Sequence, residues 1–211
     1  MRKILIGDDH AILRIALKKL IGDFIPHSEI EEADDSNSIF EKISDTEFDL
    51  IILDINIPEN SQRDLIKDIL DKQPEAKILI FSLNDEEMYA RTYLQLGVMG
   101  YLNKNTSEAE IKIAIDNILN NKKYLSASLI QRFTEDEINN KACNPFSHLS
   151  PREFEVVKHL INGESTSGIS GKLSLQPSTI STFKTRIFEK LKCSNIIELK
   201  RLCEFHKLYI F

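Results

Sequence analysis

Short apolar runs that alternate with helix-like segments constrain the fold of this sequence more than any other feature. Four such runs, at residues 3–7, 49–54, 77–82 and 98–102, have five or six residues that are mainly apolar, a length that suits a buried strand and is too short for a buried helix. A weaker strand, with two glutamates, is expected near 30–33. We therefore expect five strands in the first 102 residues of the chain.

Apolar residues recur at intervals of three and four between these runs, which is the spacing of one buried helical face. This periodicity predicts helices at about 11–21, 36–45, 63–72, 86–96 and 107–120. Strict alternation of strand and helix, with continuously apolar strands, is typical of a parallel sheet covered on both faces. The pattern predicts an α/β doubly wound domain with a five-stranded parallel sheet, of the flavodoxin-like kind.

Polar side chains follow the carboxyl ends of four of the predicted strands. Asp8 and Asp9 follow the first run, Asp54 ends the third, Ser82 ends the fourth and Lys104 follows the fifth. Ligands of doubly wound sheets bind beyond the carboxyl ends of the strands, so these side chains are expected to share one cleft. Each residue taken alone has an ordinary interpretation as a helix cap, a turn residue or a solvated charge. Their combination is what indicates a site.

Three carboxylates in one cleft repel each other, and they stay ionised together only beside a cation. Mg²⁺ is the expected cofactor, because it prefers oxygen ligands and keeps several waters. The Ser82 hydroxyl and the Lys104 ammonium suit a phosphoryl group. Asp54 would then attack a phosphoryl donor as a carboxylate nucleophile, while Mg²⁺ and Lys104 offset the charge on the phosphoryl oxygens.

The two halves of the chain differ in charge. Residues 1–123 contain 15 Lys and Arg against 24 Asp and Glu, whereas residues 148–211 contain 10 against 6. An acidic N-terminal part and a basic C-terminal part suggest different partners for the two halves of the chain. We expect a domain at 1–123, a linker at 124–147 with a helix near 127–133, and a second domain at 148–211.

Four helices are predicted in the second domain. Ser150 and Glu153 form a capping-box pattern around Pro151, and Gly163 ends the helix that follows. A short helix from about 166 to 173, a tight turn and a longer helix from 177 to 191 have the helix-turn-helix order, and a last helix covers about 195–205.

The longer helix has two different faces. One face is an apolar stripe formed by Ile180, Phe183, Ile187 and Leu191, which we expect to be buried. The other face is short, polar and basic, as a reader of the DNA major groove requires. The positive charge of this half favours attraction to DNA phosphates.

Residues 1–123 resemble a response-regulator receiver domain. The resemblance rests on Asp8-Asp9-His10, the stretch 51–58, Phe81-Ser82 and the stretch 100–104. It implies that Asp54 accepts a phosphoryl group from a sensor histidine kinase. One departure is the loop after Pro58, at 58–63, which has no glycine where the family usually has one.

The same resemblance assigns roles to the other residues of the cleft. It implies that Asp9 binds Mg²⁺ directly, Asp8 binds it through water, Asn56 supplies its backbone carbonyl and Asp54 is a further residue of the metal site. Ser82 and Lys104 would contact the phosphoryl group. Tyr101 occupies the place of the family's rotamer-switching aromatic residue.

Residues 148–206 resemble a LuxR-type helix-turn-helix. The resemblance rests on the stretches 149–153, 160–163, 178–182 and 184–187, together with Ile169, Leu173 and Lys190-Leu191. It implies that Ser181, Thr182 and Thr185 face base edges. It also implies that five residues contact or approach phosphates: Lys172, Ser178, Thr179, Lys184 and Lys190. A receiver joined to this module has the NarL/FixJ layout of two-component transcription factors.

The combined interpretation is a DNA-binding regulator whose dimerisation and DNA affinity change when Asp54 is phosphorylated. Its expected partners are a sensor histidine kinase, double-stranded DNA, a second copy of the chain and RNA polymerase.

One alternative is a phosphorylation-independent regulator whose receiver serves only for dimerisation. Another is a haloacid-dehalogenase-type phosphatase, but that chemistry needs an acid two residues after the nucleophile, where this chain has Asn56. We therefore expect no enzyme activity beyond self-phosphorylation from small donors and self-dephosphorylation.

The location of the protein is also predicted from apolar run length. No run is long enough to cross a bilayer, and acids stand where a signal peptide would need its apolar stretch. We expect a cytoplasmic protein with no membrane partner.

Overall fold

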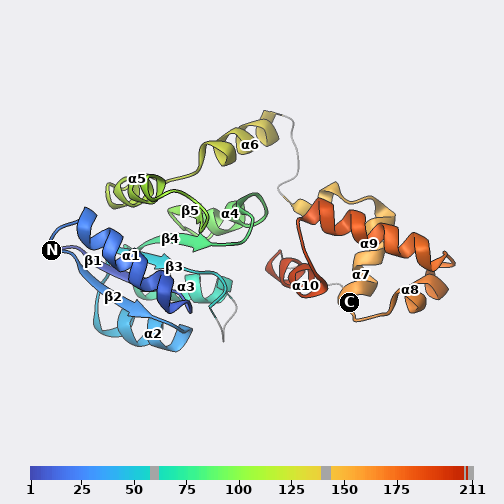
Figure 1. Cartoon of the computed structure of the whole chain (residues 1–211), viewed down its shortest axis with the longest axis horizontal. Helices are drawn as coiled ribbons and strands as arrows, with labels where there is room; N and C mark the ends of the chain where they lie inside the picture. The colour runs from blue at the N-terminus through green and yellow to red at the C-terminus, as the bar shows by residue number, and fades with distance from the viewer. Residues whose placement is uncertain (58–61, 139–143, 207, 209–211) are drawn as a thin grey trace. The chain divides into compact units, whose positions relative to one another are not determined.

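The computed structural model describes residues 1–57, 62–138, 144–206 and 208 of the chain. The chain divides into two compact units, Met1–Thr134 and Glu135–Phe211 (Figure 1). The finer boundaries at 123 and 147 stay a prediction. Among the described residues, no helix is both long enough and apolar enough to span a bilayer.

A five-stranded sheet forms the centre of the first unit. The strands lie in the order β2-β1-β3-β4-β5, and every neighbouring pair is parallel. This confirms the predicted doubly wound architecture. The strand bounds are β1 Lys3–Gly7, β2 Glu29–Ala33, β3 Leu50–Leu53, β4 Lys77–Ser82 and β5 Gly100–Asn103.

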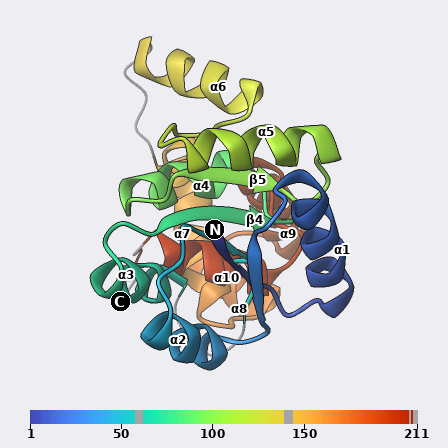
Figure 2. The same cartoon turned by 90° about the vertical axis from the view of Figure 1, so that its left-hand side faces the viewer.

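Helices cover both faces of this sheet (Figure 2). Helices α1 and α5 lie together on one face, and α2, α3 and α4 lie on the other. Their bounds are α1 Ala11–Phe24, α2 Ser36–Asp45, α3 Gln62–Lys72, α4 Glu86–Gln95 and α5 Glu108–Leu119. The predicted helices are confirmed at these places, and α1 extends beyond its predicted end to Phe24.

The main apolar core lies between the sheet and helices α1 and α5. Ile4 and Ile6 of β1 pack with Leu17 of α1 and Ile115 of α5, and all four are buried. A fully buried side chain of this size contributes about 1.5–3 kcal/mol. This core holds the strands in register and therefore sets where their carboxyl ends lie.

A buried glutamine ties the chain before β3 to the end of α3. The Gln73 side chain donates to the carbonyl oxygens of Ile43 (2.8 Å) and Thr46 (2.6 Å). Its Oε1 accepts from the N–H of Phe48 at 3.1 Å. One side chain thus satisfies three backbone groups of the α2–β3 connection.

The second unit is entirely helical in the part that the structure describes. It contains a short 3₁₀ helix, Pro145–His148, which the sequence did not predict, and four α-helices. The α-helices are α7 Pro151–Ile161, α8 Thr166–Leu173, α9 Pro177–Leu191 and α10 Ile196–Phe205. Helix α6, Ala127–Ile138, begins in the first unit and extends past the division between the units.

The helix-turn-helix is formed by α8 and α9, which pack together. The capping box of Ser150 and Glu153 at the start of α7 is present. Ser174 takes the left-handed conformation (φ 54°) at the turn between α8 and α9. Ile180 and Ile187 are fully buried, but Phe183 is only half-buried, because it lies at the margin of the apolar stripe.

Replacing Gln73 by alanine is expected to lower the free energy of unfolding of the first unit by about 2–4 kcal/mol. The substitution leaves buried backbone groups without partners, and each such group costs roughly 1–3 kcal/mol. Urea unfolding of the full chain measures the effect. Gln95→Ala, at the exposed end of α4, is the control and should change this free energy by less than about 0.5 kcal/mol. Equal stability of the two variants would contradict the prediction.

Candidate functional site

The residues that follow the strands meet at one edge of the sheet. Backbone hydrogen bonds continue the ladder one residue past the strands: the N–H of Asp54 donates to Gly7 at 2.8 Å, and the N–H of Lys104 donates to Ser82 at 2.9 Å. Because all five strands are parallel, their carboxyl ends share this edge. The structure thereby brings Asp8, Asp54 and Lys104 into contact.

The Lys104 ammonium lies between two buried carboxylates. Its Nζ is 2.7 Å from Asp8 Oδ2 and 2.8 Å from Asp54 Oδ2. The exposed fractions of the three side chains are 6% for Lys104, 2% for Asp8 and 0% for Asp54. Buried charges persist only when they are paired, and here one ammonium serves two carboxylates.

The pKa shifts in this cluster follow from burial and from the presence of two carboxylates for one ammonium. Burial raises the pKa of Asp54 above the usual range of aspartate, although its hydrogen bond to Lys104 acts in the opposite direction. Burial alone would lower the pKa of Lys104, but its bonds to Asp54 and Asp8 outweigh burial and raise it. Two carboxylates stabilise the charged form of Lys104. Asp54, in contrast, shares its single ammonium with Asp8 and is also repelled by Asp8.

Asp54 retains an unused ligand atom. Its Oδ1 is buried and has no hydrogen-bond partner among the described residues. Ligand atoms of Asp8, Asp9, His10 and Asp54 all lie within 4.8 Å of one another. An unpartnered carboxylate oxygen within a set of hard oxygen donors fits a divalent cation. The acidic cluster could therefore bind a metal ion.

His10 and Arg14 also belong to this cluster, and the sequence analysis did not assign a role to either. The His10 Nδ1 atom is 2.6 Å from Asp9 Oδ1 and 3.0 Å from Asp8 Oδ1. The Arg14 guanidinium donates to the backbone carbonyl of Asp8 at 2.6 Å. Proximity in sequence to the acid pair was the available signal for both residues. His10, and neither acid, is the N-cap residue of α1, and no side chain caps that helix.

Ser82 and Tyr101 lie in the same region around the loop that precedes α4. Ser82 is fully buried, and its Oγ accepts from the N–H of Asn84 at 3.2 Å. Tyr101 is also fully buried and donates its hydroxyl to the Asn84 carbonyl at 3.1 Å. Burial raises the pKa of Tyr101 well above its usual value, so the phenol remains a neutral donor. Its ring lies 6.2 Å from that of Tyr93 in α4.

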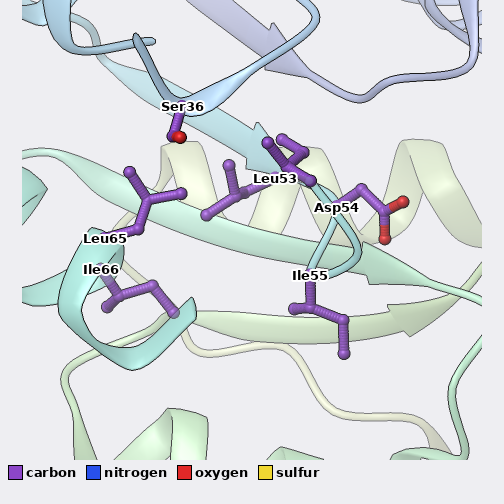
Figure 3. Close-up of a pocket in the computed structure, with 7 residues that line it drawn as sticks. Ser36, Leu53, Asp54, Ile55, Leu65 and Ile66 are labelled. Carbon is purple, nitrogen blue, oxygen red and sulfur yellow. The ribbon is translucent and has the colours of Figure 1, made fainter. Parts of the chain in front are cut away.

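A small pocket with a mainly apolar lining lies at the end of β3. It is lined by Ser36, Leu53, Asp54, Ile55, Ile57, Leu65 and Ile66. Figure 3 shows the Asp54 carboxylate turned away from Leu65 and Ile66. Asn56 is half-buried two residues after Asp54. In the glycine-less loop that follows, residues 58–61 lie outside the described part of the chain.

In the second unit, the exposed face of α9 carries the residues predicted to face bases. Ser181, Thr182 and Thr185 are all exposed. Their hydroxyls donate to carbonyls four residues earlier, at 3.1, 3.0 and 3.2 Å respectively. Each hydroxyl oxygen keeps acceptor capacity for an incoming group. Of the predicted phosphate contacts on this helix, Ser178 is exposed, and Thr179 and Lys184 are half-buried.

Two other predicted phosphate contacts are engaged in ion pairs within the unit. The Nζ of Lys190 is 2.7 Å from Oε2 of Glu153, whose side chain is only 4% exposed. The Nζ of Lys172 is 2.9 Å from Oε1 of Glu164. Lys190 therefore joins the end of α9 to the capping box of α7, so part of the basic charge counted in the sequence is already paired.

Arg186 is a candidate contact that the sequence analysis missed. It is exposed and lines an open groove on α9 together with Ser178, Thr179, Thr182 and Phe183. Ser178, Thr182 and Arg186 are spaced four residues apart and therefore lie on one helical face. That spacing was the signal that could have identified Arg186 from the sequence.

Comparison with known proteins matches both units to families. Residues 4–116, more than half of the chain, match the response regulator receiver domain. The chain belongs to the response regulators. Residues 147–203 match the bacterial regulatory proteins of the luxR family. This response regulator is thus a two-component DNA-binding regulator of the NarL/FixJ type, as the sequence predicted.

Relatives of this response regulator match along nearly its whole length. It is 28% identical to the response regulator GacA of Pseudomonas syringae pv. syringae (strain B728a), over 98% of this chain and 97% of GacA. It is 24% identical to the response regulator UvrY of Escherichia coli (strain K12), over 99% of this chain and 96% of UvrY.

Solved structures of RcsB share the fold. A structure of two RcsB dimers bound to two parallel DNAs matches with a TM-score of 0.71 at 23% identity, covering 97% of this chain and 98% of that one. RcsB from Salmonella enterica serovar Typhimurium, bound to promoter P1flhDC with the phosphomimetic BeF3⁻, has the same TM-score, identity and coverage.

Replacing Asp54 by asparagine is expected to stabilise the first unit near pH 7 when divalent cations are absent. The pKa of Asp54 is raised by folding, so its ionisation opposes folding. That penalty is absent below the unfolded-state pKa and grows as pH rises through the folded-state pKa. The gain should be on the order of 1–3 kcal/mol, the usual cost of an unpartnered buried polar atom, and it should shrink as pH falls towards 4.

Urea unfolding between pH 4 and 8 with a chelator measures this difference. Asp23→Asn, at an exposed site in α1, is the control and should show no such pH dependence. A less stable Asp54→Asn variant at pH 7 would contradict the prediction.

Replacing Arg186 by alanine is expected to weaken DNA binding and to lower the slope of log affinity against log salt by about 1, since one phosphate contact is lost. Lys190→Ala should instead reduce the stability of the second unit by about 1–3 kcal/mol, because it leaves Glu153 without its cation. DNA titrations at several salt concentrations, with thermal unfolding alongside, separate the two effects. An unchanged slope for Arg186→Ala would contradict the assignment.

Proposed function

We propose that this response regulator is switched by transfer of a phosphoryl group from a sensor histidine kinase to Asp54. The observation that carries the proposal is the pairing of Lys104 with both Asp8 and Asp54 beside the unpartnered Oδ1 of Asp54. The cluster has more negative than positive charge, and it has a free carboxylate oxygen that can act as the nucleophile.

In the transfer, a carboxylate oxygen of Asp54 attacks phosphorus. The bond between phosphorus and the histidine nitrogen of the kinase breaks, and its electron pair stays with that nitrogen. Lys104 is already hydrogen-bonded to Asp54, so its ammonium can offset charge on the phosphoryl oxygens without a large movement. Ser82 offers its hydroxyl proton to the same group.

Mg²⁺ is the cofactor that we propose for the acidic cluster. Asp9 and Asp54 would bind it directly, Asp8 would bind it through water, and Asn56 would supply its carbonyl. When bound, Mg²⁺ supplies positive charge that neutralises the carboxylates and the phosphoryl oxygens. The close grouping of ligand atoms from Asp8, Asp9, His10 and Asp54, all within 4.8 Å of one another, supports this assignment.

Phosphorylation then shifts an existing equilibrium of the receiver towards a form that dimerises and binds DNA more tightly. We propose that two copies bind two half-sites about one helical turn apart, each reading bases with α9. The RcsB structures support this proposal, since one contains two dimers bound to two parallel DNAs and another is bound to a promoter with a phosphomimetic. RNA polymerase is a further proposed partner. We also propose that the protein acts in the cytoplasm, where it would encounter these partners.

The same arrangement favours a regulator over an enzyme with a separate substrate. A phosphatase that uses an aspartyl nucleophile needs a proton donor two residues later, and the side chain there is Asn56, an amide. We propose that the chemistry of Asp54 is limited to accepting a phosphoryl group and losing it to water.

A small phosphodonor with Mg²⁺ is expected to tighten DNA binding by about tenfold, equivalent to about 1.4 kcal/mol of coupling. The Asp54→Ala variant should lose this effect while keeping its basal DNA affinity. Selection from genomic fragments supplies the DNA site, and titration of both proteins on it, with and without donor, gives the affinities. Sedimentation under the same conditions reports dimerisation. Equal responses of the wild type and the variant would show that the receiver is only a dimerisation domain.

A further inference from the structure

The helix that leaves the receiver is fastened to the first turn of α4. The Ser126 hydroxyl donates to Glu86 Oε1 at 2.8 Å, and the Ser128 hydroxyl reaches the same oxygen at 3.2 Å. Ser126 Oγ also accepts from the N–H of Leu129 at 3.3 Å. One hydroxyl therefore both caps α6 and ties it to α4.

Apolar contacts continue this attachment along α6. Leu129 is completely buried, and the Arg91 guanidinium of α4 lies 4.2 Å from the centre of the Phe133 ring. Before α6, Tyr124 pairs with Gly100 at the start of β5, and its hydroxyl donates to Glu110 of α5. Tyr124 thus contacts β5 and α5, and residues 126–133 contact α4. Figure 2 shows α6 at the end of the unit that holds these three elements.

The fastened turn of α4 lies next to the loop that contacts the acceptor cluster. Asn84, two residues before Glu86, donates its N–H to Ser82 Oγ and accepts the Tyr101 hydroxyl on its carbonyl. The Ser82 side chain is also hydrogen-bonded to Tyr101, so Ser82, Asn84 and Tyr101 form one linked group. A phosphoryl group on Asp54 would add a further acceptor beside this group, and linked hydrogen bonds polarise and strengthen one another.

We propose that Glu86, with the hydroxyls of Ser126 and Ser128, forms a clasp that couples the phosphoryl site to helix α6. Phosphorylation stabilises the Ser82–Asn84–Tyr101 arrangement, which holds the first turn of α4 in place and keeps α6 docked. Since the chain to the DNA-binding unit leaves through α6, docking sets where that connection begins. The inference rests on the proposed phosphorylation of Asp54 and assigns Glu86 a positioning role that acts through α4.

Coupling of this kind is reciprocal, so loosening α6 must weaken binding at the acceptor site by the same factor. The test uses the full chain with beryllofluoride and Mg²⁺ as the phosphoryl mimic. We expect Glu86→Ala to weaken beryllofluoride affinity, measured by fluorine NMR, by about fivefold, at the lower end of usual coupling. Ser128→Ala removes the longer contact to Glu86 and the 3.0 Å contact between the Ser128 and Ser126 hydroxyls, but it keeps the Ser126–Glu86 bond. It should weaken the affinity less and in the same direction.

Glu108→Ala is the matched control, because Glu108 is also an acid in the first turn of a helix and it pairs with Lys112. It should leave beryllofluoride affinity within twofold of the wild type. Hydrogen exchange of residues 129–134 gives a second readout. Beryllofluoride should slow exchange there in the wild type and in Glu108→Ala, and it should have little effect in Glu86→Ala.

Two outcomes would overturn the clasp. One is a Glu86→Ala variant that binds beryllofluoride as tightly as the wild type. The other is exchange of residues 129–134 that does not respond to beryllofluoride bound to the wild type. A wild-type chain that does not bind beryllofluoride at all would instead overturn the proposed phosphorylation of Asp54, and the clasp with it.

Discussion

The contact of one ammonium with two buried carboxylates is the interaction on which the site of this protein depends. Lys104 neutralises only part of the charge of Asp8 and Asp54, and Asp9 adds a third carboxylate at the solvent side. Such a cluster is stable enough to fold and still favours a further cation. The same ammonium is the group that the proposed transfer would use to offset the charge of phosphoryl oxygens.

The parallel sheet is what allows this charged cluster to form. Strands β1, β3 and β4 have apolar interiors, so the polar side chains that they bring to this edge stand where the strands end. The N–H groups of Asp54 and Lys104 remain within the backbone ladder, which fixes both side chains at the start of their loops. The same edge continues through Ser82, Asn84 and Tyr101 to the first turn of α4, and Ser126 and Ser128 bind Glu86 in that turn. The cluster of Asp8, Asp54 and Lys104 therefore lies on the same edge as the loop that leads to α4 and α6.

In the helix-turn-helix unit, ion pairs decide which basic residues are available to DNA. Lys190 holds the buried Glu153, and Lys172 holds Glu164. The exposed face of α9 is instead dominated by hydroxyls, with Arg186 at one end of its groove. Charge counted along a sequence therefore overstates the charge that a DNA backbone meets, because some cations serve the packing of the helices that carry them.

The sequence by itself determined the parallel sheet, the helix-turn-helix order and the edge at which Asp8, Asp54, Ser82 and Lys104 gather. These features follow from local periodicity and from the rule that parallel strands end at one edge. Both can be applied to the sequence without knowledge of tertiary contacts. Only the tertiary structure decided that Lys104 bridges Asp8 and Asp54, that His10 and Arg14 join the cluster, and that Lys190 is paired. It also decided that Ser126 and Ser128 meet Glu86, about 40 residues earlier in the chain. Such contacts depend on side-chain directions across packed elements, which sequence spacing does not specify.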